Sequence, residues 1–471
     1  MSVGLALSKS LEAALKSSEV VTPESDNYEQ SLRRYAASAE KRAGIVVFPK
    51  SAEDVSTVVL FSQKHNLDLA VCGGGHSTSG ASSTDGGIVI DLSKMRNVSV
   101  SPENMTITAQ GGCVWEDVDK AAAQHGLATV GGTVNHTGIG GLTLGGGYGW
   151  LSGKYGLAID NLLSVEMVLA NGRIVTASEK EHSNLFWAAR GAGQNFGVAT
   201  KFEYRAYPKK DPVWAGLLIF STDDLEPVVE FANKLVDVSE GESAMAVVLS
   251  APAPLGGAPA VIAAVFYDGP KEAGEEVFAP ITRDLKPLVN SVAEIPYQAL
   301  NGMLNGAAIF GGRKATKGSS FVTPLNPSHV RDILNEYTQF INAVPGGPGS
   351  AVILEFFNMS KICAVSNTAT AFANRGNYQN IGVAAKWDNA EDDDFCRKFA
   401  RRVAGMVKDE RIRQIGDQIE GVAEYGNYDG LGASAQEIFG SNYERLVELK
   451  TIYDPDNVFH KSFKIIPTTR N

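Results

Sequence analysis

The sequence is poor in cysteine, in long apolar runs and in basic charge, and each shortage excludes a class of protein. Its four cysteines, among 471 residues, form no CxxC or Cys/His pattern, so we expect neither a disulfide framework nor a metal site. They are Cys72, Cys113, Cys363 and Cys396, and each is predicted to be a small buried residue. The net charge of -11 argues against nucleic acid and anionic membranes as partners, because both bind basic surfaces.

Membrane spans and a secretion signal are also missing from the pattern. No uninterrupted apolar stretch has the length of a membrane span, and residues 1–9 lack a basic segment followed by an apolar core. These absences predict a soluble, cytoplasmic protein without a membrane partner. A small molecule is the expected partner, and a chain of this length can hold two or three domains.

Glycine, by contrast, is abundant and concentrates in two clusters, at residues 73–75 and 138–149. Nine of the nineteen residues from Gly131 to Gly149 are glycine. Glycine at this density costs ordering entropy, so we expect its backbone amides to lie close against a ligand. The natural ligand is a cofactor that carries a diphosphate.

The clusters match neither of the common nucleotide-binding motifs. A G-x-G-x-x-G fingerprint fails because Trp150 occupies its third position, and the Gly-Lys pair at 153–154 lacks the other residues of a P-loop. The consecutive amides of residues 73–77 can instead form an anion-binding nest. The residue types leave two interpretations of His76 in this loop, a ligand-facing side chain or an ordinary polar one.

Hydrophobic periodicity divides the chain into two kinds of pattern. Residues 1–43 are predicted to be a polar, helical lead-in, and a helix begins at Ser51 with acidic residues in its first turn. A strand at 67–72 then leads into the first glycine cluster. From about residue 212 the strands become longer and predict an antiparallel sheet with helices; they lie at 217–220, 244–249 and 261–266.

Several segments together resemble the berberine-bridge-enzyme-like FAD-linked oxidases of the vanillyl-alcohol-oxidase superfamily. They are residues 73–77, 138–149, 154–161, 184–188, 191–197, 370–376 and 442–459, so the resemblance covers nearly the whole chain. It implies an α+β fold, with a PCMH-type FAD-binding domain in two parts and a substrate domain whose antiparallel sheet is covered by helices. The two FAD-binding parts are expected at residues 1–211 and 421–471, and the substrate domain at 212–420.

The resemblance also assigns the cofactor residues. It implies that His76 bonds covalently to the 8α-methyl group of FAD. Many members attach the flavin a second time through cysteine, but Val134 stands at that position, so a single attachment is expected. His136 is an alternative anchor, at a position that varies in the family, and Thr137 resembles the family's oxygen gate. The full set comprises His76, Gly73, Gly74, Gly75, Ser77, Val134, Thr137, Gly138, Gly140, Gly141, Leu142, Gly146, Gly147, Tyr148, Asn161, Val198 and Asn457.

Three residues are candidates for the catalytic chemistry. Tyr428 resembles the tyrosine that carbohydrate-oxidising members use as a base, and Tyr425 lies in the same segment. A phenol with an ordinary pKa of about 10 is a poor base unless its surroundings lower that value. Glu355 is a single carboxylate on the apolar strand 352–357, where it faces either solvent or the substrate cavity.

The resemblance implies an FAD-dependent oxidase that transfers a hydride from a small organic substrate to flavin N5 and returns the electrons to O2 as H2O2. An alcohol, an amine, a sugar or a secondary-metabolite intermediate would fit, and the missing secretion signal favours secondary metabolism. Two alternatives remain open: an FAD dehydrogenase with another electron acceptor, and a flavin-binding carrier or cyclase without redox turnover.

Overall fold

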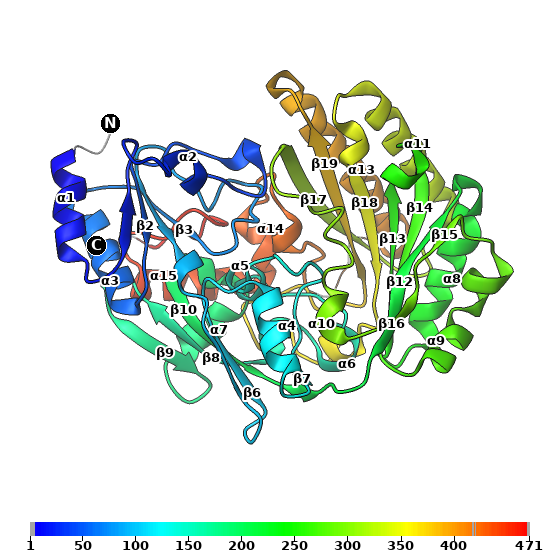
Figure 1. Cartoon of the computed structure of the whole chain (residues 1–471), viewed down its shortest axis with the longest axis horizontal. Helices are drawn as coiled ribbons and strands as arrows, with labels where there is room; N and C mark the ends of the chain where they lie inside the picture. Colours follow the sequence, from blue (N-terminus) through cyan, green and yellow to red (C-terminus); the bar gives the residue numbers. More distant parts are fainter. Residues whose placement is uncertain (1–4, 417–418, 420, 469–471) are drawn as a thin grey trace.

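The protein has two lobes, which Figure 1 shows side by side. The computed structural model describes residues 5–416, 419 and 421–468. The first lobe combines the N-terminal and C-terminal parts of the chain, and the second lobe is built from its middle. Among the described helices, none is both long enough and apolar enough to cross a bilayer.

The first sheet of the first lobe delivers the chain to the glycine loop. Its strand order is β1-β2-β4-β3, with β2 and β3 parallel to β4 and with β1 as an antiparallel edge strand. The strands are β1 (Glu19–Val21), β2 (Ile45–Phe48), β3 (Leu69–Cys72) and β4 (Ile88–Asp91), and the helices are α1 (Leu5–Ala14), α2 (Tyr28–Ser31) and α3 (Ala52–Lys64). Helix α3 begins where it was predicted, because the Ser51 hydroxyl accepts a hydrogen bond from the Asp54 N–H at 3.2 Å.

The second sheet of this lobe is antiparallel, with the order β5-β6-β10-β8-β9. Its strands are β5 (Val98–Ser101), β6 (Thr106–Gln110), β8 (Leu162–Val168), β9 (Ile174–Ser178) and β10 (Val198–Arg205), and β7 (Leu127–Ala128) pairs with β11 (Tyr207–Pro208) nearby. The helices are α4 (Trp115–Ala123), α5 (Ile139–Leu144), α6 (Ser152–Tyr155) and α7 (Ser183–Ala192). The second glycine cluster therefore runs through α5 and the loop that follows it.

The second lobe is the predicted antiparallel sheet with helices. The main strand order is β15-β12-β14-β13-β18-β19-β17, and β16 also pairs with β12. Its strands are β12 (Val213–Phe220), β13 (Ser243–Ser250), β14 (Ala260–Tyr267), β15 (Val289–Asn290), β16 (Ala293–Ile295), β17 (Arg313–Phe321), β18 (Ala351–Phe356) and β19 (Gln379–Trp387), and its helices are α8 (Leu225–Val238), α9 (Lys271–Val277), α10 (Tyr297–Leu300), α11 (Pro327–Ala343), α12 (Ser360–Cys363) and α13 (Asp393–Ile415). The three apolar strands expected at 217–220, 244–249 and 261–266 are confirmed within β12, β13 and β14.

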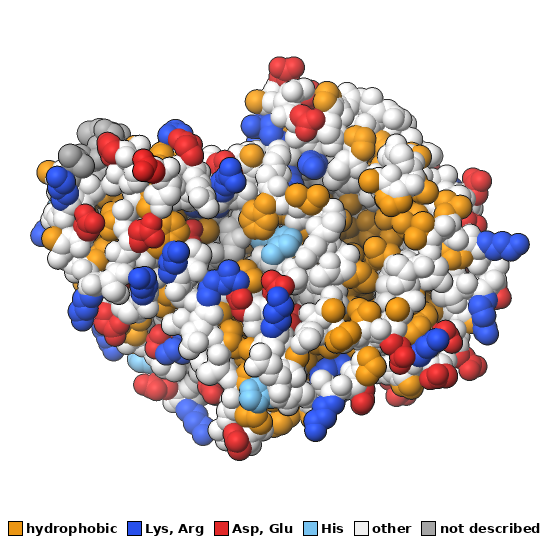
Figure 2. Space-filling view, in the orientation of Figure 1, with side chains coloured by type: hydrophobic (Ala, Val, Ile, Leu, Met, Phe, Trp, Pro, Cys, Tyr) orange, Lys and Arg blue, Asp and Glu red, His pale blue; other side chains and the backbone are white. Residues whose placement is uncertain are grey.

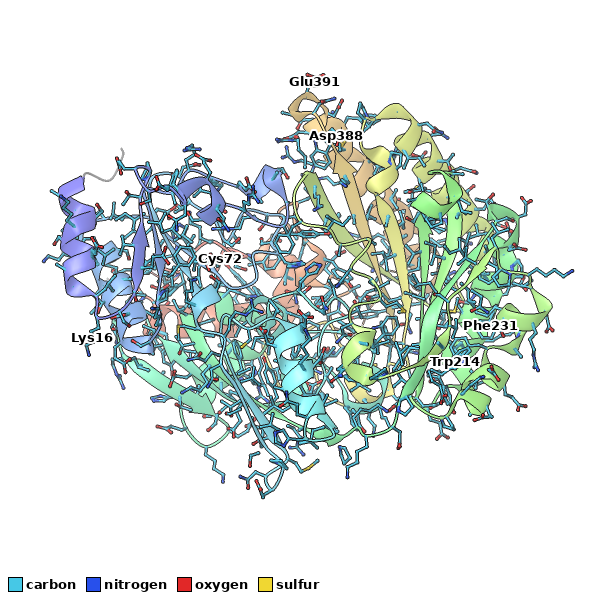
Figure 3. The ribbon with its side chains drawn as sticks, viewed as in Figure 1. Lys16, Cys72, Trp214, Phe231, Asp388 and Glu391 are labelled. Atoms are coloured by element: carbon cyan, nitrogen blue, oxygen red, sulfur yellow. The ribbon has the colours of Figure 1, made fainter. Side chains whose placement is uncertain are left out.

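The two faces of this sheet have different neighbours. Helices α8, α11 and α13 bury one face in an apolar core that includes Trp214 and Phe231, both labelled in Figure 3. The other face packs against Tyr148, Trp150 and Tyr425. This second face is therefore the one turned toward the glycine clusters.

The C-terminal tail returns to the first lobe. Helices α14 (Ala435–Phe439) and α15 (Tyr443–Tyr453) share a core with α7 and the second sheet. Lys450 anchors the tail, because its buried ammonium donates to the Asp454 carboxylate at 2.6 Å and to the Asn195 and Phe459 carbonyls at 2.7 Å. The predicted domain boundaries stay predictions, and the one at residue 420 lies outside the described residues.

Two local expectations are wrong. The lead-in at residues 1–43 is not helical throughout, because Glu19–Val21 pairs with β2 as an edge strand. Two adjacent β-branched residues, Val20 and Val21, favour that strand. Cys72, Cys113 and Cys396 are buried as expected, whereas Cys363, at the end of the short helix α12, is exposed.

Candidate active site

The two glycine clusters touch through their backbones. A Cβ added to Gly74 would lie 2.3 Å from the amide nitrogen of Gly138, so any side chain there would push the two loops apart. Gly75 has a φ of 68°, a conformation that residues with side chains rarely adopt. The clusters therefore need glycine partly to meet each other.

The first cluster also offers backbone donors to a ligand. Within the described chain, the N–H groups of Gly74, His76 and Ser77 donate to no protein acceptor. Neighbouring unpaired amides form a site for an anion. At Gly141, in the second cluster, an added Cβ would meet no atom within 4 Å, so space is open there. An anionic diphosphate joined to a flat ring system, as in FAD, fits both features.

Later glycines of the second cluster pack against the substrate lobe and the tail. A Cβ on Gly146 would lie 2.5 Å from the Phe372 ring, and one on Gly147 would lie 2.6 Å from the Ala158 Cβ. The Gly147 N–H donates to the hydroxyl of Tyr425 at 3.2 Å. These glycines bring the tail tyrosines next to the glycine clusters.

His76 lies in a cage of aromatic rings. Its ring stacks on Tyr35 with centroids 4.5 Å apart and meets Phe310 edge-on at 5.3 Å. Its Nε2 atom lies 2.8 Å from Nδ1 of His136. Its other ring nitrogen, Nδ1, makes no hydrogen bond to another side chain in the described part of the chain. Burial, together with the nearby His136 and Lys314, lowers the pKa of His76 to about 3, so the ring is neutral at ordinary pH.

Lys314, on β17, supplies positive charge beside this cage. Its side chain is buried, and its ammonium lies 3.8 Å from the centroid of the Tyr35 ring. The ammonium donates to the backbone carbonyls of Tyr35 and Gly311 at 2.7 Å and also to that of Ile309. Burial, with a smaller contribution from Lys386, lowers the pKa of Lys314 to about 8.

Tyr428 and Glu355 form the second reactive group of the site. The Tyr428 hydroxyl donates to Oε1 of Glu355 at 2.6 Å, although the two residues are 73 positions apart. Glu355 is only 4% exposed, and burial raises its pKa to about 7. Burial and the adjacent Glu355 raise the pKa of Tyr428 well above its ordinary value. The two groups are therefore placed to exchange a proton directly.

Two glycines on facing strands make room for Tyr428. Gly318 of β17 and Gly382 of β19 are paired in the sheet. A Cβ on Gly318 would lie 2.7 Å from the Tyr428 Cβ, and one on Gly382 would lie 3.5 Å from the Tyr428 ring. Lys314 and Gly318 are four residues apart on β17, which corresponds to about 13 Å at the usual rise of a strand. One strand thus links the His76 cage to the Tyr428–Glu355 pair.

Tyr425 lies between this pair and the second glycine cluster. Its ring contacts those of Tyr148 and Tyr428 edge-on, each at 4.9 Å between centroids. The Tyr425 hydroxyl accepts hydrogen bonds from the Gly147 N–H and from Nδ2 of Asn427. Burial raises the pKa of Tyr425 to about 12, so this residue stays protonated and holds the neighbouring rings in place.

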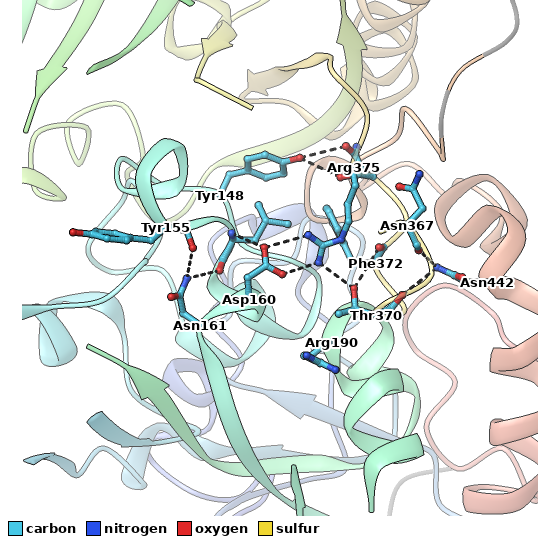
Figure 4. A network of polar contacts seen from close by, with 12 residues as sticks. Tyr148, Tyr155, Asp160, Asn161, Arg190, Asn367, Thr370, Phe372, Arg375 and Asn442 are labelled. Atoms are coloured by element: carbon cyan, nitrogen blue, oxygen red, sulfur yellow. Dashed lines mark hydrogen bonds and ion pairs between the residues drawn. The ribbon is translucent and has the colours of Figure 1, made fainter. Parts of the chain in front are cut away.

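Figure 4 shows the polar network that fixes the segment 370–376 against the glycine-rich lobe. The Arg375 guanidinium is fully buried and pairs with Asp160 through two hydrogen bonds, at 2.7 and 3.1 Å. Arg375 also donates to the Thr370 hydroxyl, and the Tyr148 hydroxyl donates to the Asn374 side chain at 3.3 Å. A buried bidentate ion pair of this kind fixes the position of this segment relative to the glycine-rich lobe.

The remaining cofactor candidates lie either beside the first glycine cluster or elsewhere in the first lobe. Val134, Thr137, Gly138, Gly140 and Leu142 lie on or just before α5, beside the first cluster, and Gly73 follows β3. The Asn161 side chain makes its hydrogen bonds within the protein: its amide donates to the Tyr155 and Leu157 carbonyls, and its oxygen accepts from the Tyr207 hydroxyl. Val198 is a buried first residue of β10, and the buried Oδ1 of Asn457 has no partner among the described residues.

Sequence reasoning missed the residues that surround His76. Tyr35 lies in the segment that was expected to be helical, and Phe310 lies in the loop before β17. The residues around Lys314 on β17 are mostly small or polar, so the local pattern gives no sign that this lysine is buried. Its three carbonyl partners come from distant or irregular segments, which no local pattern reveals.

Comparison with known proteins defines the class first. A model of the FAD binding domain matches residues 43–178, and a model described as "Berberine and berberine like" matches residues 424–465. These segments contain both glycine clusters and the tail tyrosines. The chain therefore contains an FAD-binding domain and a berberine-like segment.

Full-length relatives define the family. The FAD-linked oxidoreductase pgmH of Aspergillus terreus is 36% identical over 467 residues, which cover 94% of this chain and 92% of that protein. The (R)-6-hydroxynicotine oxidase of Paenarthrobacter nicotinovorans is 27% identical over 465 residues, covering 95% and 96%. The structure of BBE-like 1 from Physcomitrella patens matches with a TM-score of 0.84 at 21% identity, covering 99% of this chain and 100% of that one. The chain belongs to the berberine-like FAD-linked oxidoreductases, and its α+β architecture is that of their PCMH-type structures.

Proposed function

We propose that the protein is an oxidase that carries FAD covalently on His76 and oxidises a small, largely apolar organic molecule at a hydroxyl-bearing or amine-bearing carbon. When bound, FAD accepts a hydride from the substrate, and O2 takes the electrons to give H2O2. The observation that carries this proposal is the hydrogen bond between the half-buried Tyr428 and the buried Glu355, on the sheet face that is turned toward the glycine clusters.

The pair acts as a proton relay. Oxidation of an alcohol to a carbonyl requires a group that accepts the hydroxyl proton. Tyr428 alone is a poor base, because burial and Glu355 hold its pKa above the ordinary value. Tyr428 can instead pass its own proton to the Glu355 carboxylate as it takes the substrate proton. Glu355, with its pKa raised to about 7, is half ionised near neutral pH and is the final acceptor.

His76 suits the attachment because its ring is neutral. An imidazole must be unprotonated to form a bond through nitrogen, and the lowered pKa of about 3 keeps His76 in that form. The buried thiols of Cys72 and Cys113 are poor competitors, since burial raises both of their pKa values to about 12. These environments support a single attachment, to histidine.

The sheet face around Glu355 supports an apolar substrate. Ala246 faces Glu355 across β13 and β18, and the next row on the same face pairs Val248 with Ile353. Ile353, Leu217 and Tyr428 are partly buried and pack against the same apolar core. Figure 2 shows hydrophobic side chains lining a broad hollow on this view of the molecule. A surface of this kind favours a secondary-metabolite intermediate over a sugar.

The choice of O2 is supported by a relative and by Thr137. One relative is named as an oxidase, and Thr137 presents a small side chain next to the contact of the two glycine clusters. The test is to reduce the flavin anaerobically, mix it with aerated buffer, and follow flavin absorbance and H2O2 together. Rapid reoxidation with one H2O2 per flavin supports an oxidase. A reduced flavin that persists in air but reacts with an artificial acceptor would establish a dehydrogenase.

A further inference from the structure

We propose that His136 is a positioning residue for flavin attachment: it accepts the proton of His76 Nε2 and so directs the covalent bond to His76 Nδ1. The inference rests on the proposed function, because it presupposes that His76 carries the flavin. The contact that carries it is the 2.8 Å distance between Nε2 of His76 and Nδ1 of His136.

His136 is held in place from two sides. Its ring lies 4.9 Å from the His76 ring and 5.3 Å from the Phe310 ring. The neighbouring Asn135 is tied to the same loop, because its N–H donates to the Asn301 carbonyl and its side chain accepts from Asn305, both at 2.8 Å. The His136 ring therefore cannot turn freely away from His76.

The charges around the two rings keep both of them unprotonated. Burial lowers the pKa of His136, and the Lys314 ammonium lowers it further. Glu116 and the backbone of Ala308 oppose this shift. One neutral imidazole can donate its single N–H to the lone pair of the other. With the His76 proton on Nε2, the Nδ1 atom keeps a free lone pair.

Attachment forms one C–N bond and breaks one C–H bond. The Nδ1 lone pair of His76 forms a bond to the 8α carbon of FAD, and one C–H bond of that carbon breaks. The C–H proton passes to solvent water, and the proton on His76 Nε2 passes to Nδ1 of His136. The two electrons of the broken bond remain on the flavin, which is thereby reduced. O2, the acceptor of the proposed function, takes these two electrons and two protons and becomes H2O2.

The experiment measures attachment itself. Full-length chain, produced in riboflavin-starved cells, is mixed with FAD, and the covalent fraction is followed by intact mass after acid quenching. His136→Ala and His136→Gln are compared with His125→Ala, a control that removes an exposed histidine beyond the end of α4. Glutamine can accept the hydrogen bond but cannot take up the proton. Because a positioned acid–base group contributes about a hundredfold or more, attachment should slow by about a hundredfold in both His136 variants.

Three further readouts separate proton transfer from a merely structural role. Both His136 variants should bind FAD with unchanged affinity before attachment, and added imidazole should restore the rate of His136→Ala. Peptide mapping should find the flavin on His76, and NMR of the isolated flavin peptide should place the bond on Nδ1. Attachment at the wild-type rate in both variants, loss of FAD binding in both, or flavin on His136 or on His76 Nε2 would overturn the inference. Wild-type protein without any covalent flavin would instead refute the proposed function, and the inference with it.

Discussion

Replacing Glu355 with glutamine should change how the stability of the protein depends on pH. The Glu355 carboxyl is 4% exposed, and burial raises its pKa from 4.5 to about 7. The folded state therefore holds this proton more tightly than the unfolded chain does. The stabilisation is complete below about pH 4.5 and is lost as the pH rises through about 7.

The size of the effect follows from the pKa difference. Each unit is equivalent to about 1.4 kcal/mol, so the wild type should lose about 3 kcal/mol relative to Glu355→Gln over the whole range. Between about pH 5.5 and about pH 8 the expected relative loss is about 2 kcal/mol. Glutamine has the same shape and can still accept the Tyr428 hydrogen bond, so packing is conserved.

Urea unfolding of the holoprotein at several pH values measures this difference. Asp119→Asn is the matched control, because burial also raises the pKa of Asp119 to about 7, and that carboxylate accepts from Asn301 rather than from Tyr428. Both variants should show the altered pH dependence, but only Glu355→Gln should slow flavin reduction. If wild type and Glu355→Gln gave parallel stability curves, Glu355 would titrate normally and the burial argument would be wrong.

Three further outcomes are expected. Gly318→Ala should slow flavin reduction by tenfold or more, because the new Cβ would lie 2.7 Å from the Tyr428 Cβ. Gly382→Ala should have little effect, because its Cβ would lie 3.5 Å from the Tyr428 ring. If stopped-flow reduction gave the two variants equal rates, this steric argument would be wrong. Lys450→Met should destabilise the protein by about 3–5 kcal/mol, because it leaves the fully buried Asp454 carboxylate without its cation. Calorimetry measures this loss, and an unchanged melting temperature would show that the ion pair contributes nothing. The rate of flavin reduction by a substrate should rise about tenfold per pH unit below about pH 7 and level off above it, as Glu355 ionises; a flat profile would exclude Glu355 as the proton acceptor.

Local patterns in the sequence predicted much of the framework. Ser51 caps α3 because its hydroxyl and the acidic first turn are local features. The apolar strands of the second lobe were recognisable because both faces of the sheet are buried, one under helices and one against the first lobe. The strand at Glu19–Val21 was not predicted, because three residues are too few to show a periodic pattern and its pairing with β2 is a long-range contact.

The site was predictable as a set of candidates but not as an arrangement. The strand pattern left Glu355 facing either solvent or a cavity, and only the sheet register and the return of the tail bring it to Tyr428. The same limit applies to His136, whose ring meets His76 because the backbones of Gly74 and Gly138 touch. Contacts between segments 60 or more residues apart leave no local periodicity to recognise.

The most direct test of the account is the intact mass of the protein after acid denaturation, with the absorbance spectrum of the precipitate. The account predicts a mass increase of one FAD on the wild-type chain, a flavin spectrum in the precipitate, and loss of both in His76→Ala. Release of all the flavin into the supernatant from wild type, or an unchanged adduct in His76→Ala, would contradict the central role assigned to His76.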